Sequence, residues 1–130
     1  MKNKTAKDIM KTNVITVNSD TAVTDAIAIL LEHDISTLPV LDNNQKLIGI
    51  MSEHDIINFT FSGDADNTKV AEALTPQVIT FSPETDLATL VNCCVTKHIR
   101  IIPIVEGGKV VGIVGRRDIL RETMKFYQRL

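Results

Sequence analysis

A serine and an aspartate three residues apart carry the clearest chemical potential in this sequence. Ser52 and Asp55 follow an apolar run and open a predicted helix, whose first backbone N–H groups lack partners and can hold an anion. The Asp55 carboxylate can accept hydrogen bonds from both hydroxyls of a ribose, Ser52 adds a hydroxyl, and Gly49 would let a ligand approach the backbone. The same spacing is also a capping box, in which both side chains only satisfy the helix N-terminus. Both interpretations stay open at the level of local sequence.

A second aspartate, Asp118, follows a similar apolar run but lacks the hydroxyl partner. Gly115 stands at the position that Ser52 holds in the first pattern. An aspartate kept without its reciprocal capping partner slightly favours a ligand role, although an acid in the first turn of a helix is favourable by itself. The sequence therefore holds two related patterns, of which only the first has a hydroxyl partner for its aspartate.

Catalytic and metal chemistry find little support. Ser52, His54 and Asp55 are neighbours in the chain, whereas a nucleophile, a base and an orienting acid normally converge from separate elements. None of the three histidines stands at helical ligand spacing from another histidine or from a cysteine, and the adjacent Cys93 and Cys94 match neither a zinc pair nor a Cys-x-x-Cys redox motif. The sequence predicts no enzyme activity, no catalytic residue, no catalytic cofactor and no metal site.

The composition is that of an ordinary globular domain. The 130 residues include 14 basic and 16 acidic ones, for a net charge of −2, and 4% are aromatic. This near-neutral balance gives no reason to expect a nucleic-acid or anionic-membrane surface. The longest apolar run, Ala26–Leu31, is far shorter than the roughly 20 residues of a membrane span, and no export signal is visible. These features predict a cytoplasmic protein.

The closing segment, residues 116–130, is a basic stretch. It holds five basic and two acidic residues, a net charge of +3, which leaves a nucleic-acid contact as an alternative. We expect instead an amphipathic last helix, whose inward residues would be Ile119, Leu120, Thr123 and Phe126.

The elements that position these residues occur twice. Shifted by 64, the sequence overlays itself: Val14-Ile15-Thr16 falls on Val78-Ile79-Thr80, and Leu38-Pro39-Val40 falls on Ile102-Pro103-Ile104. After a one-residue shortening in a polar turn the shift is 63, and Asp55-Ile56 falls on Asp118-Ile119. The chain is therefore predicted to be a tandem repeat, with repeat one at residues 1–66, repeat two at residues 67–130, and a polar linker at Ser62–Asn67.

Each repeat predicts the same order of elements. A short opening helix leads to a β-branched strand, an amphipathic helix, a two-stranded hairpin and a closing helix. The expected elements are helices at Thr5–Met10 and Lys69–Leu74, strands at Val14–Val17, Leu38–Leu41 and Lys46–Met51, their counterparts at Val78–Phe81, Ile101–Val105 and Lys109–Val114, and closing helices starting near Glu53 and Arg116. A strand–helix–strand crossover makes the first two strands parallel, so each repeat should hold a small mixed three-stranded sheet with helices on one face.

This order of elements resembles the CBS domain, a family named after cystathionine β-synthase. The marks are a hydrophobic-Pro-hydrophobic step before the hairpin, Gly-Ile-x-Ser-x-x-Asp after it, and the opening Thr5-Ala6-Lys7-Asp8-Ile9-Met10. The chain looks like a free-standing tandem pair, a Bateman module. The resemblance implies an α/β (α+β) fold in which the two repeats pack with pseudo-two-fold symmetry. It also implies a regulatory role in binding adenosine-containing ligands in clefts between the repeats.

The family pattern implies two ligand sites. Site one would join Ile50, Ser52 and Asp55 to Ile79, Ile99 and Arg100. The apolar residues would sandwich adenine, and the Arg100 guanidinium would fork onto phosphate oxygens, unless it is only a solvated surface arginine. Site two would join Ile113, Arg116 and Asp118 to Ile15, Ile35 and Ser36. There the sequence departs from the pattern, since Gly115 replaces Ser or Thr and Ser36 replaces arginine, so Arg116 or Arg117 would have to contact phosphate.

The resemblance also implies partners. The expected ligand is AMP, ADP, ATP or S-adenosylmethionine, whose occupancy would be transmitted to an effector enzyme or transporter. Such modules often pair through their helices, so a homodimer is expected, with no nucleic-acid or membrane partner. The alternative is a non-catalytic dimerisation adaptor with vestigial ligand sites.

Overall fold

The computed structural model describes residues 3–59, 61 and 63–128. Ser62, where the expected linker begins, and residues 129 and 130 of the closing segment lie outside the described residues. The chain forms two compact units. Unit 1 joins the residues up to Val14 to those from Ile79 onward, and unit 2 is Ile15–Val78. The compact units therefore have other limits than the sequence repeats, because the opening segment of each repeat packs with the other repeat's elements.

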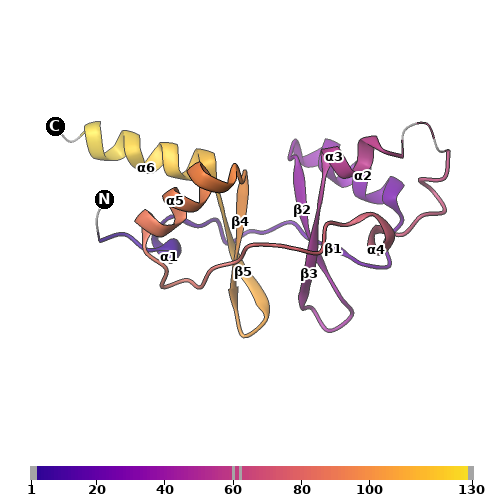
Figure 1. Cartoon of the computed structure of the whole chain (residues 1–130), viewed down its shortest axis with the longest axis horizontal. Helices are drawn as coiled ribbons and strands as arrows, with labels where there is room; N and C mark the ends of the chain where they lie inside the picture. The colour runs from indigo at the N-terminus through magenta and orange to yellow at the C-terminus, as the bar shows by residue number, and fades with distance from the viewer. Residues whose placement is uncertain (1–2, 60, 62, 129–130) are drawn as a thin grey trace. The chain divides into compact units, whose positions relative to one another are not determined.

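Unit 2 holds a mixed three-stranded sheet in the order β1-β2-β3. Its elements are β1 (Val17–Asn18), α2 (Val23–His33), β2 (Thr37–Leu41), β3 (Leu47–Ser52), α3 (Glu53–Ile57) and α4 (Val70–Ala73). β1 and β2 are parallel, as the α2 crossover requires, and β2 and β3 form an antiparallel hairpin. The helices α2 and α4 lie on one side of this sheet (Figure 1). The predicted mixed α/β fold with helices on one face is confirmed.

Unit 1 repeats this plan with one strand fewer. It contains α1 (Ala6–Ile9), α5 (Leu87–Lys97), β4 (Ile101–Glu106), β5 (Lys109–Gly115) and α6 (Arg116–Gln128). β4 and β5 form a hairpin that turns through Gly107 and Gly108 at φ 61° and 80°, values that suit a tight two-residue turn.

The third strand expected in unit 1 is reduced to a single parallel bridge between Phe81 and Ile104. In unit 2 the Ser19 N–H donates to the Leu41 carbonyl at 2.9 Å and continues the ladder beyond β1. The repeat places Pro83 at the position of Ser19, and proline has no N–H to donate. The expected three-stranded sheet is therefore correct for unit 2, whereas the ladder in unit 1 ends at Phe81.

Each unit has its own hydrophobic core. The core of unit 2 is built from Val17, Val23, Ala26, Leu30, Leu38, Val40, Met51 and Val70. The core of unit 1 is built from Ala6, Leu90, Cys93, Ile102, Ile104 and Val114. The opening helices are exchanged between repeats: α1 contributes Ala6 to the core of unit 1, and α4 contributes Val70 to the core of unit 2. Both cores thus depend on segments distant in sequence.

Gly49 provides room for the protein's own backbone rather than for a ligand. A Cβ at this position would lie 2.7 Å from the Thr75 carbonyl oxygen and 2.7 Å from the Leu74 side chain. The equivalent Gly112 faces the Met10 side chain in the same way. The expectation that Gly49 admits a ligand to the backbone is therefore wrong, because the segment after the opening helix occupies that space.

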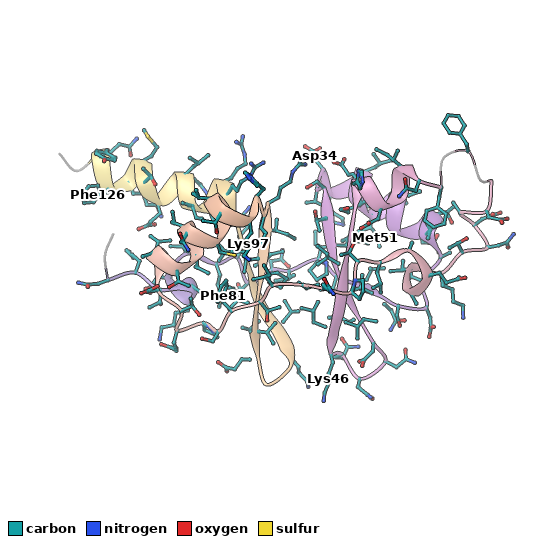
Figure 2. The ribbon with its side chains drawn as sticks, viewed as in Figure 1. Asp34, Lys46, Met51, Phe81, Lys97 and Phe126 are labelled. Atoms are coloured by element: carbon teal, nitrogen blue, oxygen red, sulfur yellow. The ribbon has the colours of Figure 1, made fainter. Side chains whose placement is uncertain are left out.

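The inward face of α6 agrees with the expected one at Ile119 and Thr123, which are half-buried, and differs from it at Leu120 and Phe126. Leu120 is 58% exposed and Phe126, near the end of the helix (Figure 2), is 38% exposed, whereas Asp118 and Glu122 are buried. The burial of these acids has a physical cause, since Lys4 lies 3.4 Å from Glu122 and Lys11 lies 4.0 Å from Asp118. Across the described residues, no helix combines the length and the apolar composition that a bilayer span requires.

Candidate functional site

The junction of β3 and α3 forms the predicted Ser-x-x-Asp arrangement. Ser52 is the N-cap of α3; its N–H donates to Asp55 Oδ2 at 2.9 Å and its hydroxyl donates to the same oxygen at 3.0 Å. In return the Asp55 N–H donates to Ser52 Oγ at 3.3 Å. The capping box is thus formed, and it directs the carboxylate of Asp55 toward the start of the helix.

Thr75 is a further partner of Asp55 that the sequence analysis missed. Its hydroxyl lies 3.1 Å from Asp55 Oδ1 and 3.3 Å from Oδ2. The Thr75 backbone also pairs with Ile50, with N···O distances of 3.0 and 2.8 Å in the two directions. The segment that follows α4 therefore runs beside β3 and brings a second hydroxyl to the carboxylate.

The junction of β5 and α6 holds Asp118 in a different environment. The Gly115 N–H donates to Asp118 Oδ2 at 2.7 Å, the Arg121 guanidinium donates to Oδ1, and Lys11 Nζ lies 4.0 Å from Oδ1. The Lys11 backbone pairs with Ile113 at 2.9 Å in both directions, as the Thr75 backbone pairs with Ile50. A shift of 64 overlays Lys11 on Thr75, so the repeat could have identified these two residues as equivalent neighbours of the aspartates.

The two carboxylates are therefore unequally available. Asp55 is half-buried and has only neutral hydroxyl and backbone partners, and its Oδ1 accepts from Thr75 alone among the described residues. Asp118 is 8% exposed, and its Oδ1 is shared by two cations. A carboxylate oxygen has two lone pairs, so Asp55 Oδ1 can accept one further hydrogen bond without losing a charged partner. Asp55 is the better ligand candidate.

Other predicted site residues border the same junctions. The Ser36 carbonyl accepts from the first N–H of α3, that of Glu53, at 2.9 Å, and the Arg100 carbonyl accepts from the first N–H of α6, that of Arg116, at 3.1 Å. The structure therefore brings Ser36 beside Ser52, although they were assigned to different sites, and does the same for Arg100 and Arg116. The side chains of Arg100 and Arg116 are both exposed.

The six isoleucines of the two predicted sites differ in where they lie. Ile50 and Ile113 lie half-buried on β3 and β5. Ile15 and Ile35 pack against the core of unit 2, Ile99 packs against the core of unit 1, and Ile79 is 37% exposed. Of these six, Ile79 is the residue with the largest accessible apolar surface.

The two cysteines are free thiols, Cys93 buried and Cys94 half-buried. Burial raises the pKa of the Cys94 thiol above its ordinary value, the neighbouring Cys93 adds to this, and Arg116 acts in the opposite direction. A raised pKa keeps the thiol protonated and a poor nucleophile. Among the residues that the structure describes, no cluster of three or more histidine, cysteine, aspartate or glutamate side chains could hold a metal ion.

Gly115→Ser is expected to restore the missing half of the capping box. A Cβ at Gly115 would have Asp118 Oδ2 as its nearest neighbour, at 3.5 Å, so the side chain fits. We expect Gly115→Ser to exceed Gly115→Ala in free energy of unfolding by about 0.5–2 kcal/mol, the usual value of an N-cap hydroxyl. Urea unfolding of the two variants measures the difference. Equal stabilities would show that the hydroxyl makes no capping bond at this position.

The comparisons with known proteins agree with this duplicated geometry. A family model described as CBS domain matches residues 6–61 and 70–125. The chain belongs to the CBS domain family. The two matched segments correspond to the two predicted repeats and together cover most of the chain.

Relatives of this CBS-domain chain include much longer proteins and solved structures of similar length. An A-adding tRNA nucleotidyltransferase of Geobacter sulfurreducens is 30% identical over 91% of this chain and 13% of its own length. The solved structure of CBSX2 in complex with AMP is 26% identical, with a TM-score of 0.85 over 95% of this chain and 98% of that one. The CBS domain pair of protein MJ0100, in complex with 5-methylthioadenosine and S-adenosyl-L-methionine, is 29% identical, with a TM-score of 0.82 over 94% and 97%. The chain spans 13% to 42% of the length of the first curated relatives.

Proposed function

We propose that this chain is a regulatory module that binds an adenosine-containing ligand, either an adenine nucleotide or S-adenosylmethionine. The observation that carries the proposal is Asp55, a carboxylate held at the end of β3 with an oxygen free to accept a further hydrogen bond. Its support from relatives is that two CBS-domain structures of similar fold are complexes with AMP and with S-adenosylmethionine.

In the proposed site one, Asp55 Oδ1 accepts a ribose hydroxyl and Ser52 lies at the same edge. Ile50, Ile79 and Ile99 supply apolar surface for adenine, and Arg100 supplies a guanidinium for phosphate. Within the described part of the chain, only the backbone carbonyl of Arg100 is engaged, by Arg116, so the exposed Arg100 side chain can turn toward an anion. A nucleotide with phosphates would therefore gain from Arg100 an ion pair that a neutral adenosine lacks.

The proposed site two uses the equivalent positions Ile113, Arg116 and Asp118 with Ile15, Ile35 and Ser36. We expect weaker binding there for two reasons. Gly115 offers no hydroxyl, and Asp118 is already engaged by Arg121 and Lys11. A ribose would have to share an oxygen that two cations hold.

Regulation requires a recipient. Occupancy would act through a homodimer of the chain on an effector enzyme or transporter, which is either a further domain of a longer chain or a separate protein. The occurrence of a similar segment within a much longer tRNA nucleotidyltransferase supports the first arrangement. The ligand can shift the module only by its difference in affinity for the two states.

Thermal unfolding against a ligand panel tests the proposal. Nucleotide-free protein is melted with AMP, ADP, ATP, S-adenosylmethionine and NAD in turn. A ligand that binds only the folded chain adds about 2.7 kcal/mol at 100 times its Kd, which gives an easily measured rise in Tm. If no ligand raises the Tm, the sensor proposal fails for these ligands, and a dimerisation adaptor becomes the better account.

A further inference from the structure

The outer side of α6, the last helix of unit 1, exposes a row of large apolar side chains (Figure 1, yellow). Leu120, Met124 and Tyr127 are each more than half exposed. Their spacing of four and three residues places them in one stripe along the helix. The buried residues of α6 are instead Asp118 and Glu122. The stripe is therefore apolar surface that the described residues leave open to a partner.

Most of this stripe lies on a part of α6 that has no helical counterpart in unit 2. The repeat overlays Leu120 on Ile57, and the equivalent helix α3 ends at Ile57. α6 continues to Gln128, which adds about two turns. A surface hollow of about 470 Å³ follows these turns. It is lined by Arg117, Leu120, Arg121, Met124, Lys125 and Gln128. We call these six residues, together with Tyr127, the α6 docking face.

The docking face carries positive charge that its own helix does not neutralise. Each of the two acids of α6 lies beside two cations, one from the N-terminal segment and one from α6 itself. The α6 members of these pairs are Arg121 and Lys125, whose side chains remain more than half exposed. Arg117 forms no salt bridge with the described residues. Two carboxylates thus share four cations and Arg117 adds a fifth, so the face attracts an anionic partner.

The residue types of this face are those of a protein interface. Tyrosine, methionine and arginine are enriched in interfaces relative to the rest of protein surfaces. The Tyr127 ring lies edge-on to the ring of Phe126, with 5.2 Å between the two centroids. An aromatic ring that is already oriented loses little conformational freedom when a partner covers it, so Tyr127 is suited to anchor one end of a bound segment.

We propose that the α6 docking face binds an acidic amphipathic helix of the recipient, with the apolar side of that helix on the stripe and its carboxylates on the basic residues. The proposal rests on the proposed function for the existence of a recipient, and it adds where the recipient is held and by what chemistry. Anchors spaced by three and four residues are typical of a contact with one amphipathic helix. The unneutralised positive charge selects an acidic helix over a basic one.

Two other occupants match this face less well. An anionic bilayer presents a plane, whereas the stripe is narrow, and unit 2, with 2 basic and 10 acidic residues, would be repelled by the bilayer. Pairing of α6 with α6 of a second copy would set basic side chains against their own copies. An acidic helix satisfies the apolar stripe and the charge together.

Tyrosine fluorescence reports on this contact, because Tyr127 is the only tyrosine of the chain and the chain has no tryptophan. The probe is a synthetic peptide of about 20 residues, long enough to form a helix, with leucines along one side, glutamates beside them and alanines elsewhere. Nucleotide-free protein is titrated with it, since Arg117 is also a candidate phosphate contact. We expect a saturable change in Tyr127 fluorescence, and none with the peptide that has lysine in place of every glutamate.

Two variants test the charge and the stripe separately. Arg117→Glu is expected to raise the Kd of the acidic peptide at least about tenfold through like-charge repulsion, and an acid is tolerated in the first turn of α6. Met124→Gln is expected to raise it at least about threefold, because apolar surface is lost from the middle of the stripe. Lys109→Glu on the β4–β5 hairpin and Leu31→Gln on the exposed side of α2 are the matched controls, and both should leave the Kd unchanged. Circular dichroism confirms that every variant is folded.

Several results would overturn the proposal. Tyr127 fluorescence that stays constant up to about 1 mM acidic peptide, or equal binding of the lysine peptide, would remove the docking face. A Kd unaffected by Arg117→Glu and Met124→Gln would place the peptide elsewhere. A response to phosphatidylserine vesicles in place of the peptide would assign the face to a bilayer, and a peptide Kd that rises with chain concentration would show that a second copy covers it.

The ligand panel separates this proposal from the proposed function. A rise in Tm with an adenosine ligand, in protein that binds no acidic peptide, would overturn the docking face and keep the ligand proposal. Peptide binding with the expected losses in the two variants, in protein whose Tm no ligand raises, would support the docking face and remove the ligand proposal.

Discussion

Asp55→Asn is expected to raise the Kd of the adenosine ligand by about 10- to 150-fold while the chain stays folded. One hydrogen bond to a charged acceptor contributes about 1.5–3 kcal/mol, and each 1.4 kcal/mol is a factor of ten in Kd. Asparagine keeps one acceptor oxygen but loses the charge and the second acceptor. Isothermal titration of both proteins with the ligand that gives the largest rise in Tm measures the change.

Asp8→Asn is the matched control for this variant. Thr5 and Asp8 form the same capping box as Ser52 and Asp55: Thr5 N–H and Oγ1 lie 2.8 and 3.0 Å from Asp8 Oδ2. Asp8 is exposed and belongs to neither proposed site. Both variants lose the charge of the cap, and Asp55→Asn also alters the contacts with Thr75, whereas only Asp55→Asn should lose ligand. Equal affinities in the two variants would reduce Asp55 to a capping residue.

Leu38→Ala is expected to lower the free energy of unfolding by about 2–5 kcal/mol, the usual cost of a buried leucine together with the cavity that it leaves. Leu38 lies on β2 in the core of unit 2 with 0% of its surface exposed. A loss of this size is a large fraction of the stability of a small domain. Urea unfolding measures this loss of stability, provided that the midpoint and the slope of the transition are analysed together.

Leu31→Ala is the control, because the same residue type on the neighbouring helix α2 is 76% exposed. At a chain concentration low enough for assembly to contribute nothing, its effect should stay within about 0.5 kcal/mol. A Leu38→Ala loss no larger than that of Leu31→Ala would contradict the packing described for this core.

Local sequence predicted most of the secondary structure, because helices, turns and caps depend on residues that are near one another in the chain. The amphipathic spacing of Val23, Ala26 and Leu30 marked α2, the Gly107-Gly108 pair marked the turn of the β4–β5 hairpin, and the Ser52–Asp55 spacing marked the N-terminus of α3. The internal repeat extended each of these to a second copy and indicated the family. The missing third strand of unit 1 was also a local effect, since it follows from the absent N–H of one proline.

Contacts between distant segments were decided only by the tertiary structure. Thr75 reaches Asp55 from 20 residues away, and Lys11 lies beside Asp118 from across the whole chain. With Thr75 as its neighbour, Asp55 can accept a further hydrogen bond, whereas Lys11 helps to engage Asp118. The local motifs around the two aspartates are nevertheless similar. Helical periodicity predicted Leu120 as an inward residue of α6. In the structure the buried residues of this helix are instead Asp118 and Glu122, which lie beside Lys11 and Lys4.

The sequence by itself determined the duplicated elements, the hairpins and the capping box, since each depends on residues a few positions apart. The tertiary structure decided which segments share a unit, and with that the distribution of charge. The sequence repeats already differ in net charge, −5 for residues 1–66 and +3 for residues 67–130, and the exchange of the opening segments in the fold widens the difference to −8 for unit 2 and +6 for unit 1. The physical reason is that burial, and the distribution of charge over a surface, depend on contacts between distant segments. Such contacts exist only after the chain has folded.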